Sequence, residues 1–188
     1  VPIIAGTGAN STKEAVYLTS SAQKAGASAA LLVTPYYNKP TQEGLFKHYL
    51  EIASEVDIPQ ILYNVPSRTG CDLLPETVLR LSEISNIVGI KEATPNIQRL
   101  KELKKLLKNH SFKLLSGDDL TATEFMLNGG DGIISVTANI VPDKIVKVCA
   151  LVSKNLKDDA LVCDSSLKDL HKVLFIESSP IPVKWALH

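Results

Sequence analysis

The sequence predicts an α/β protein, a (βα)8 barrel of which about six βα units are present, followed by C-terminal helices. Three observations lead to this fold class. Short apolar runs alternate with helical patterns, the runs recur at the spacing of a βα unit, and polar residues gather where the runs end. With 45% hydrophobic residues among 188, the chain also has the composition of a packed globular protein.

The apolar runs are rich in Val, Ile and Leu and are too short for helices, which is typical of strands in a parallel sheet. We expect strands, buried on both faces, at Pro2–Ala5, Ala30–Val33, Gln60–Leu62, Ile87–Ile90, Phe112–Leu115 and Gly132–Ser135.

Between these runs, apolar residues recur at helical spacing, as in the stripe of leucines from Leu100 to Leu107 with lysines opposite. Pro75 with Asp72 and Glu76 indicates a helix start, and Gly26 indicates a helix end. The expected helices are Thr12–Lys24, Gln42–Val56, Pro75–Ile84, Ile97–Lys108 and Thr121–Leu127, with more helix from Pro142 onward.

The spacing of the strand ends identifies the repeating unit. Successive ends are 28, 29, 28, 25 and 19 residues apart, close to the length of a βα unit, at Gly6, Thr34, Tyr63, Lys91, Ser116 and Ser135. We therefore predict two regions. Residues 1–141 form a partial barrel, units 3 to 8 of the complete fold, and residues 142–188 form the last barrel helix and a C-terminal helical region.

Polar residues at the strand ends favour a barrel over a doubly wound open sheet. A barrel brings such residues together on one rim, where barrel enzymes have their active sites. An open sheet usually has a Gly-rich phosphate loop after its first strand, and Gly6–Asn10 is only superficially similar to one. The polar residues are Thr34, Tyr36, Tyr37, Tyr63, Arg68, Lys91, Glu92, Ser116, Asp118, Asp119 and Thr137.

Composition excludes several classes of function. Twenty basic and twenty acidic residues give a net charge of zero, so no electrostatic footprint for nucleic acid or an anionic membrane is expected. The longest run of apolar or small residues, Ala25–Val33, is far shorter than the roughly 20 residues of a spanning helix. Cys71, Cys149 and Cys163 are an odd number without a C-x-x-C pair, which favours reduced thiols in a cytoplasmic protein.

Lys91 is the main candidate for a catalytic residue. It ends an apolar strand, where partial desolvation would lower its pKa and supply a neutral amine for Schiff-base formation; pairing with Glu92 is the alternative. Tyr63 ends the preceding strand and could pass protons to Lys91, or it could simply cover the core. Arg68 follows in a Pro- and Gly-containing loop, suited either to a substrate carboxylate or to an ion pair on the rim.

The segments Tyr63–Gly70 (YNVPSRTG) and Gly89–Ala93 (GIKEA) resemble the pyruvate-dependent class I aldolase family. The resemblance extends over essentially the whole chain. Further matching segments are Gly6–Asn10, Val33–Asn38, Leu115–Asp119, Gly132–Asn139 and Pro180–Trp185.

This resemblance implies a lyase that condenses pyruvate with L-aspartate-4-semialdehyde in lysine (diaminopimelate) biosynthesis. It implies a homotetramer, a dimer of dimers, that needs no metal or organic cofactor; the four histidines show no ligand spacing. Lys91 would form the imine, Tyr63 would relay protons and Arg68 would bind the semialdehyde carboxylate. By the same resemblance, Tyr37 crosses the dimer interface into the partner's site. Gly117 and Ile134 would line the pyruvate pocket.

Asn10, Glu14 and Tyr36 match positions that bind L-lysine in lysine-inhibited members of the family. Each has a simpler interpretation from the sequence: Asn10 as a helix N-cap, Glu14 as a favourable first-turn charge and Tyr36 as interface packing. We expect lysine inhibition.

Other interpretations remain open from the sequence. N-acetylneuraminate lyase and related sugar-acid aldolases would share Lys91 and Tyr63, but Arg68 argues against a polyol substrate. The family's first two βα units, including a threonine for the pyruvate carboxylate, have no counterpart here, so we expect the N-terminal part of the enzyme to be lacking. A chain limited to these residues would be an inactive fragment, acting only as an assembly or lysine-binding module.

Overall fold

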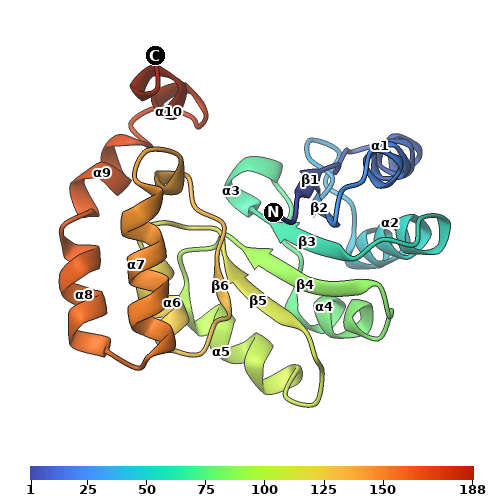
Figure 1. Cartoon of the computed structure of the whole chain (residues 1–188). Coiled ribbons are helices and arrows are strands. Elements are labelled where there is room, and N and C mark those ends of the chain that lie inside the picture. Colours follow the sequence, from blue (N-terminus) through green and yellow to red (C-terminus); the bar gives the residue numbers. More distant parts are fainter. The chain divides into compact units, whose positions relative to one another are not determined.

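The computed structural model describes all 188 residues, which form two compact units, Val1–Leu114 and Leu115–His188 (Figure 1). The boundary between these units, at 114/115, lies earlier in the chain than the boundary predicted at 141/142. The predicted boundary separates the barrel from the C-terminal helical region, and it stays a prediction. A helix does begin at Pro142, as expected.

The first unit contains four parallel strands that pair in chain order: β1 (Ile4–Gly6), β2 (Ala29–Val33), β3 (Gln60–Asn64) and β4 (Ile87–Glu92). The register brings Val33 of β2 opposite Tyr63 of β3, and Tyr63 opposite Lys91 of β4. The predicted alignment of Tyr63 with Lys91 is therefore confirmed.

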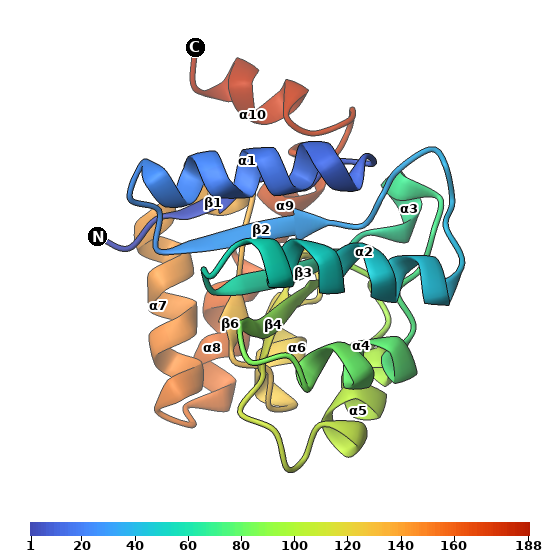
Figure 2. The ribbon, with the colours of Figure 1, turned by 90° about the vertical axis from the view of Figure 1, so that its right-hand side faces the viewer.

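Helices cover one face of this sheet: α1 (Thr12–Lys24), α2 (Gln42–Glu55), α4 (Pro75–Ser82) and α5 (Ile97–Leu106). Each packs on the next in chain order, and Figures 1 and 2 show α1, α2 and α4 on the same side of the strands. The helices begin where the sequence offers side-chain caps, at Ser11, Thr41 and Asn96. The expected helices of this unit are confirmed, and three of them end one or two residues earlier than expected.

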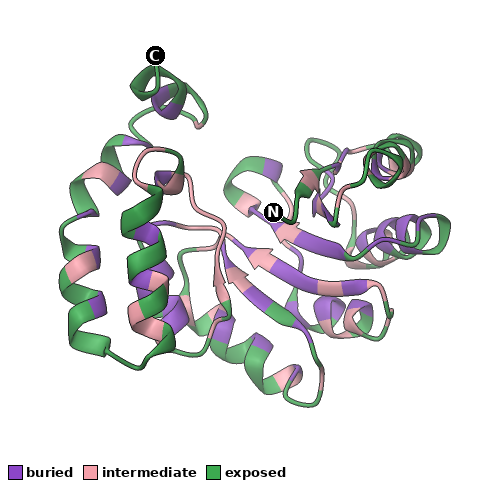
Figure 3. Cartoon of the chain, in the orientation of Figure 1, coloured by how far each residue is buried: buried purple, intermediate pink, exposed green.

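The two faces of the sheet differ in burial (Figure 3). On the helix face, Leu32, Leu62 and Ile90 are completely buried, and the Gln60 side chain donates to backbone carbonyls of Ile52 and Val56. Because side chains alternate along a strand, Val33, Tyr63 and Lys91 share the opposite face, and all three are only partly buried. The expected burial is thus met only in part on this opposite face, where Ile61 is buried but the three residues at the strand ends are not.

The second unit pairs the end of β5 (Lys113–Ser116) with β6 (Gly132–Ile133) in parallel. Its core joins Met126, Ile145, Val148 and Leu167, and α7 packs against both α6 and α8. Its helices are α6 (Ala122–Leu127), the 3-10 turn η1 (Thr137–Asn139), α7 (Pro142–Ser153), α8 (Lys157–Ser165), α9 (Lys168–Val173) and α10 (Ile181–Ala186).

One expected strand end is wrong. Strand β6 ends at Ile133 rather than Ser135, because the Asp119 carboxylate binds the Ser135 hydroxyl and the backbone N–H of Val136. The helix start expected at Pro75 is confirmed, with Glu76 in its first turn, whereas the Asp72 carboxylate accepts two hydrogen bonds from Arg99, at 2.6 and 3.3 Å. That helix begins without any side-chain cap.

None of the helices is both long and apolar enough to cross a bilayer. The three cysteines are free thiols, which agrees with the expectation that they form no disulfide.

Candidate active site

Lys91 and Tyr63 form a contact pair at the carboxyl ends of two adjacent parallel strands. The Lys91 Nζ lies over the Tyr63 ring, 4.2 Å from its centroid. The two residues are Cα partners in the ladder between β3 and β4. An amine and a phenol thus share one partly exposed position at the end of the sheet.

The environment of Tyr63 keeps its hydroxyl protonated at neutral pH. Burial raises the pKa of Tyr63 above 10, and the charge of Arg68 opposes that shift. Arg68 is therefore near enough to act on Tyr63 electrostatically, although its own side chain is exposed.

Glu92 was the alternative partner for Lys91, but its side chain lies on the opposite, helix face of β4. Its carboxylate is buried, accepts hydrogen bonds from the Asn64 side chain at 3.1 and 3.3 Å, and accepts another from the Thr94 N–H at 2.8 Å. Burial raises the pKa of Glu92, and these hydrogen bonds oppose the shift. The sequence alternation along β4 thus assigns Lys91 and Glu92 to different surroundings.

Arg68 lies on a short helix that the sequence analysis did not anticipate, α3 (Pro66–Thr69). Gly70 ends this helix in the left-handed conformation, with φ at +74°, which glycine adopts without strain. The Tyr37 N–H donates to the Thr69 carbonyl at 3.2 Å, so the loop after β2 is joined to α3.

The backbone of Tyr37 adopts an unusual conformation. Its φ is +74°, which costs a non-glycine residue roughly 1–2 kcal/mol, and its side chain is 89% exposed. Its expected role across a dimer interface stays a prediction.

Gly117 and Ile134 belong to the second unit, where they follow the paired strand ends of β5 and β6. The Ile134 N–H donates to the carbonyl of Ser116, the residue before Gly117, at 2.9 Å. Both Gly117 and Ile134 are partly buried. Asp119 fixes the backbone after Ile134 through its bonds to Ser135, Val136 and Thr137.

Asn10 and Tyr36 meet in the first unit, because the Asn10 side-chain amide donates to the Tyr36 carbonyl at 3.2 Å. The suggestion that Asn10 caps the following helix is wrong: the cap is Ser11, whose hydroxyl accepts from the Glu14 N–H. Glu14 lies in the first helical turn, where its charge is favourable.

Two residues organise these surroundings: Asn64, which was not singled out from the sequence, and Asp119, which was placed on the rim without a role. Each is a buried polar residue at or just beyond an apolar strand end. A polar residue at the end of an apolar strand was the sequence signal that could have identified both. No cluster of three or more His, Cys, Asp or Glu side chains is arranged to hold a metal ion.

The chain matches solved structures of dihydrodipicolinate synthases. The chain is similar to dihydrodipicolinate synthase from Acinetobacter baumannii, solved in complex with pyruvate, with 57% identity and a TM-score of 0.97 over 100% of this chain and 64% of that one. It is also similar to the enzyme from Cyanidioschyzon merolae with lysine bound, with 36% identity and a TM-score of 0.94 over 99% of this chain and 63% of that one. The parallel α/β units thus match part of a (βα)8 barrel enzyme.

The family model described as "Dihydrodipicolinate synthetase family" matches residues 1–188, and the chain belongs to this family. A curated relative from Pseudomonas syringae pv. syringae, named 4-hydroxy-tetrahydrodipicolinate synthase, is 61% identical over all 188 residues. The chain spans 64% of that relative's length. The expectation that the N-terminal part is the missing one stays a prediction.

Proposed function

We propose that Lys91 is the imine-forming lysine of an enzyme that condenses pyruvate with L-aspartate-4-semialdehyde to give 4-hydroxy-tetrahydrodipicolinate, in the lysine (diaminopimelate) pathway. The observation that carries this proposal is the position of Lys91 Nζ over the Tyr63 ring at 4.2 Å. The names of relatives with up to 61% identity support the choice of reaction.

The first half of the reaction builds a carbon nucleophile. Neutral Lys91 attacks the ketone carbon of pyruvate, the oxygen leaves as water and an imine forms between Nζ and the former carbonyl carbon. Loss of a methyl proton then gives an enamine. Only the neutral amine is a nucleophile, so a proton must leave the Lys91 ammonium before attack. The Tyr63 hydroxyl is the group we assign to carry protons in these steps.

The second half uses the aldehyde. The enamine carbon attacks the aldehyde carbon of the semialdehyde and forms a carbon–carbon bond, and the aldehyde oxygen takes up a proton. The amino group of the adduct then attacks the imine carbon, which closes the ring and releases Lys91. The iminium nitrogen formed on Lys91 takes up the electrons in these steps, so we expect no metal or organic cofactor.

Arg68 is proposed to bind the carboxylate of the semialdehyde, since a guanidinium matches a carboxylate with two parallel hydrogen bonds. Its exposure and its electrostatic effect on Tyr63 support this role. Gly117 and Ile134 are proposed to line the pyruvate pocket. Tyr37 is proposed to reach the site of a partner subunit in a cytoplasmic homotetramer, a role that its 89% exposure supports.

Asn10, Glu14 and Tyr36 are proposed to bind L-lysine as a feedback inhibitor. The hydrogen bond between the Asn10 amide and the Tyr36 carbonyl supports their grouping. The relative from Cyanidioschyzon merolae was solved with lysine bound.

The test uses the full-length protein that contains this chain. Pyruvate is supplied with L-aspartate-4-semialdehyde, and consumption of both is followed with and without L-lysine. In parallel, the protein is given N-acetylneuraminate. We expect pyruvate-dependent consumption of the semialdehyde and no cleavage of the sugar acid. Cleavage of N-acetylneuraminate without condensation would assign the chain to the sugar-acid lyases. Pyruvate binding without either reaction would contradict the proposed activity.

A further inference from the structure

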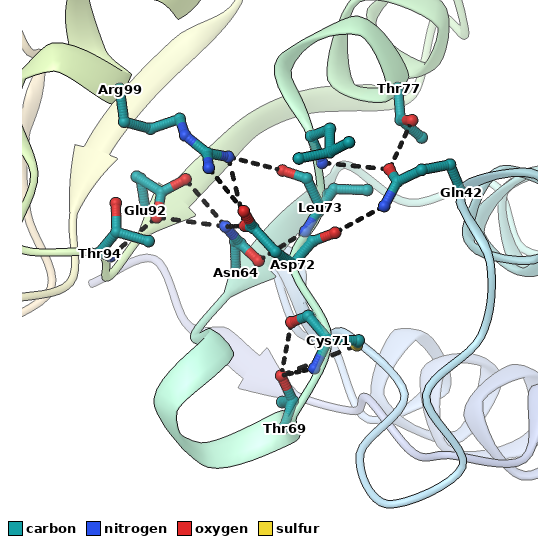
Figure 4. A network of polar contacts seen from close by, with 11 residues as sticks. Gln42, Asn64, Thr69, Cys71, Asp72, Leu73, Thr77, Glu92, Thr94 and Arg99 are labelled. Carbon is teal, nitrogen blue, oxygen red and sulfur yellow. Dashed lines mark hydrogen bonds and ion pairs between the residues drawn. The ribbon is translucent and has the colours of Figure 1, made fainter.

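Behind the pair of Tyr63 and Lys91 lies a second polar layer, on the helix face of the sheet (Figure 4). Asn64 follows Tyr63 and Glu92 follows Lys91, and the two are Cα partners across β3 and β4. Their side chains are 0% and 1% exposed. Buried polar groups at such positions persist only when they are hydrogen-bonded.

The Asn64 side chain bonds to three different partners. Its Oδ1 accepts from the Leu73 N–H at 3.0 Å. Its Nδ2 donates to Asp72 Oδ1 at 2.8 Å and to Glu92 Oε2 at 3.1 Å. An amide has one acceptor oxygen and two donor hydrogens, so this arrangement uses both kinds of group.

Two of these partners lie beyond the helix that carries Arg68. The chain leaves β3 at Asn64, forms α3, turns at Gly70 and returns at Asp72 and Leu73. Both returning residues bond to Asn64, so its side chain closes the base of this loop, which we call the Arg68 loop (residues 65–71). On the outer side, Gln42 holds the same return segment through the Asp72 carbonyl at 2.7 Å and the Leu74 N–H at 3.1 Å.

The chemistry of the site requires an amide at position 64. The amide donates to two carboxylates, Asp72 and Glu92, which would otherwise repel each other. Arg99 balances Asp72 with a 2.6 Å ion pair and also donates to the Leu73 carbonyl at 3.1 Å. A carboxylate at position 64 would keep the acceptor for Leu73 but would add a third negative charge.

We propose that Asn64 is a positioning residue, which fixes the Arg68 loop against the strand ends that carry Tyr63 and Lys91. The catalytic consequence rests on the proposed function, since it concerns the distance between the imine carbon and the guanidinium that holds the second substrate. The structural consequence, that the Asn64 side chain closes the base of the Arg68 loop, is independent of any activity.

The first experiment tests the structural consequence. Hydrogen exchange of the peptide that covers residues 65–74 is compared for wild type, Asn64→Ala and the control Asn86→Ala in the full-length protein. Asn86 also donates two side-chain hydrogen bonds, to the carbonyls of Ala53 and Val56, but it precedes β4 at the other end of the strand. We expect about tenfold faster exchange in this peptide for Asn64→Ala and no change for the control. Equal exchange in all three proteins would overturn the proposal.

The second experiment tests the catalytic consequence and uses Asn64→Asp, which keeps the shape of the side chain and changes its hydrogen bonding and charge. The KM for the semialdehyde is expected to rise about tenfold at pH 8 and less at pH 6, where a proton shared between the introduced carboxyl group and Glu92 restores one hydrogen bond. An unchanged KM at both pH values would overturn the positioning role. Absence of any pyruvate-dependent turnover in the wild type would instead refute the proposed function, and the exchange result would still decide whether Asn64 closes the loop.

Discussion

Replacing Tyr63 with phenylalanine separates the contribution of its aromatic ring to the Lys91 site from that of its hydroxyl group. The ring remains under the Lys91 Nζ, 4.2 Å from the ring centroid, while the hydroxyl is removed. A cation over an aromatic face is worth about 0.5–2 kcal/mol, and Tyr63→Phe keeps most of this contact. Because Tyr63 is only partly buried, we expect the free energy of unfolding to change by less than about 1 kcal/mol.

The expected catalytic effect is much larger than the effect on folding. Since burial raises the pKa of Tyr63, the hydroxyl is protonated at neutral pH and is available to donate a hydrogen bond and to pass protons. Loss of a positioned proton-transfer group typically costs about 10²–10⁴-fold in rate, or about 3–5 kcal/mol of barrier. We therefore expect turnover to fall by this factor, with the proportion of protein that finally forms the pyruvate imine unchanged.

The assay measures turnover and the time course of pyruvate adduct trapped by borohydride, in the full-length protein. Tyr63→Leu serves as the comparison, because it removes both the hydroxyl and the aromatic face. Tyr63→Phe should reach the wild-type amount of adduct slowly. Turnover within about threefold of wild type in Tyr63→Phe would refute the proton-relay role and leave Tyr63 as a packing residue.

Three further outcomes follow from other parts of the molecule. Arg68→Ala should weaken use of the semialdehyde by about 1.5–3 kcal/mol, measured as its KM, and should leave the pyruvate imine intact; the reverse pattern would give Arg68 another role. Gly70→Ala should destabilise the protein by about 1 kcal/mol or more in urea unfolding, because φ is +74° and a Cβ would lie 3.0 Å from Lys39 Cε. Burial lowers the pKa of His48 to about 4, so the unfolded chain binds a proton between pH 6.5 and 4 that the folded chain does not. Stability should fall by up to about 3 kcal/mol as the pH drops through this window, and His48→Phe should abolish that loss; an equal pH dependence in both proteins would contradict it.

Much of the first unit could be predicted because its signals are local. The interval of 28 residues between Tyr63 and Lys91 is one βα unit, and the parallel pairing of adjacent strands brings such residues side by side. The helices of this unit begin within one residue of their predicted starts, because Pro, Ser and Asn at those starts act within a single turn.

The rest depends on contacts between residues that are distant in sequence. The end of β6 is set by Asp119, whose carboxylate lies 16 or more residues earlier in the chain. The role of Asp72 is set by Arg99, 27 residues later, and not by the adjacent helix. Asn10 and Ser11 are both good capping residues, and only the backbone geometry selects Ser11. Asn64 has no motif of its own, because its three partners come together only in the folded unit.

The central claim, that Lys91 forms an imine with pyruvate, is tested most directly by trapping that imine. The full-length protein is treated with pyruvate and borohydride, digested and mapped by mass spectrometry, with Lys91→Arg as the control. Reduction fixes the substrate on nitrogen, so the account predicts one stoichiometric adduct on the peptide that contains Lys91 and none in Lys91→Arg. An adduct on a different lysine, or no adduct in a protein that still consumes pyruvate and the semialdehyde, would contradict it.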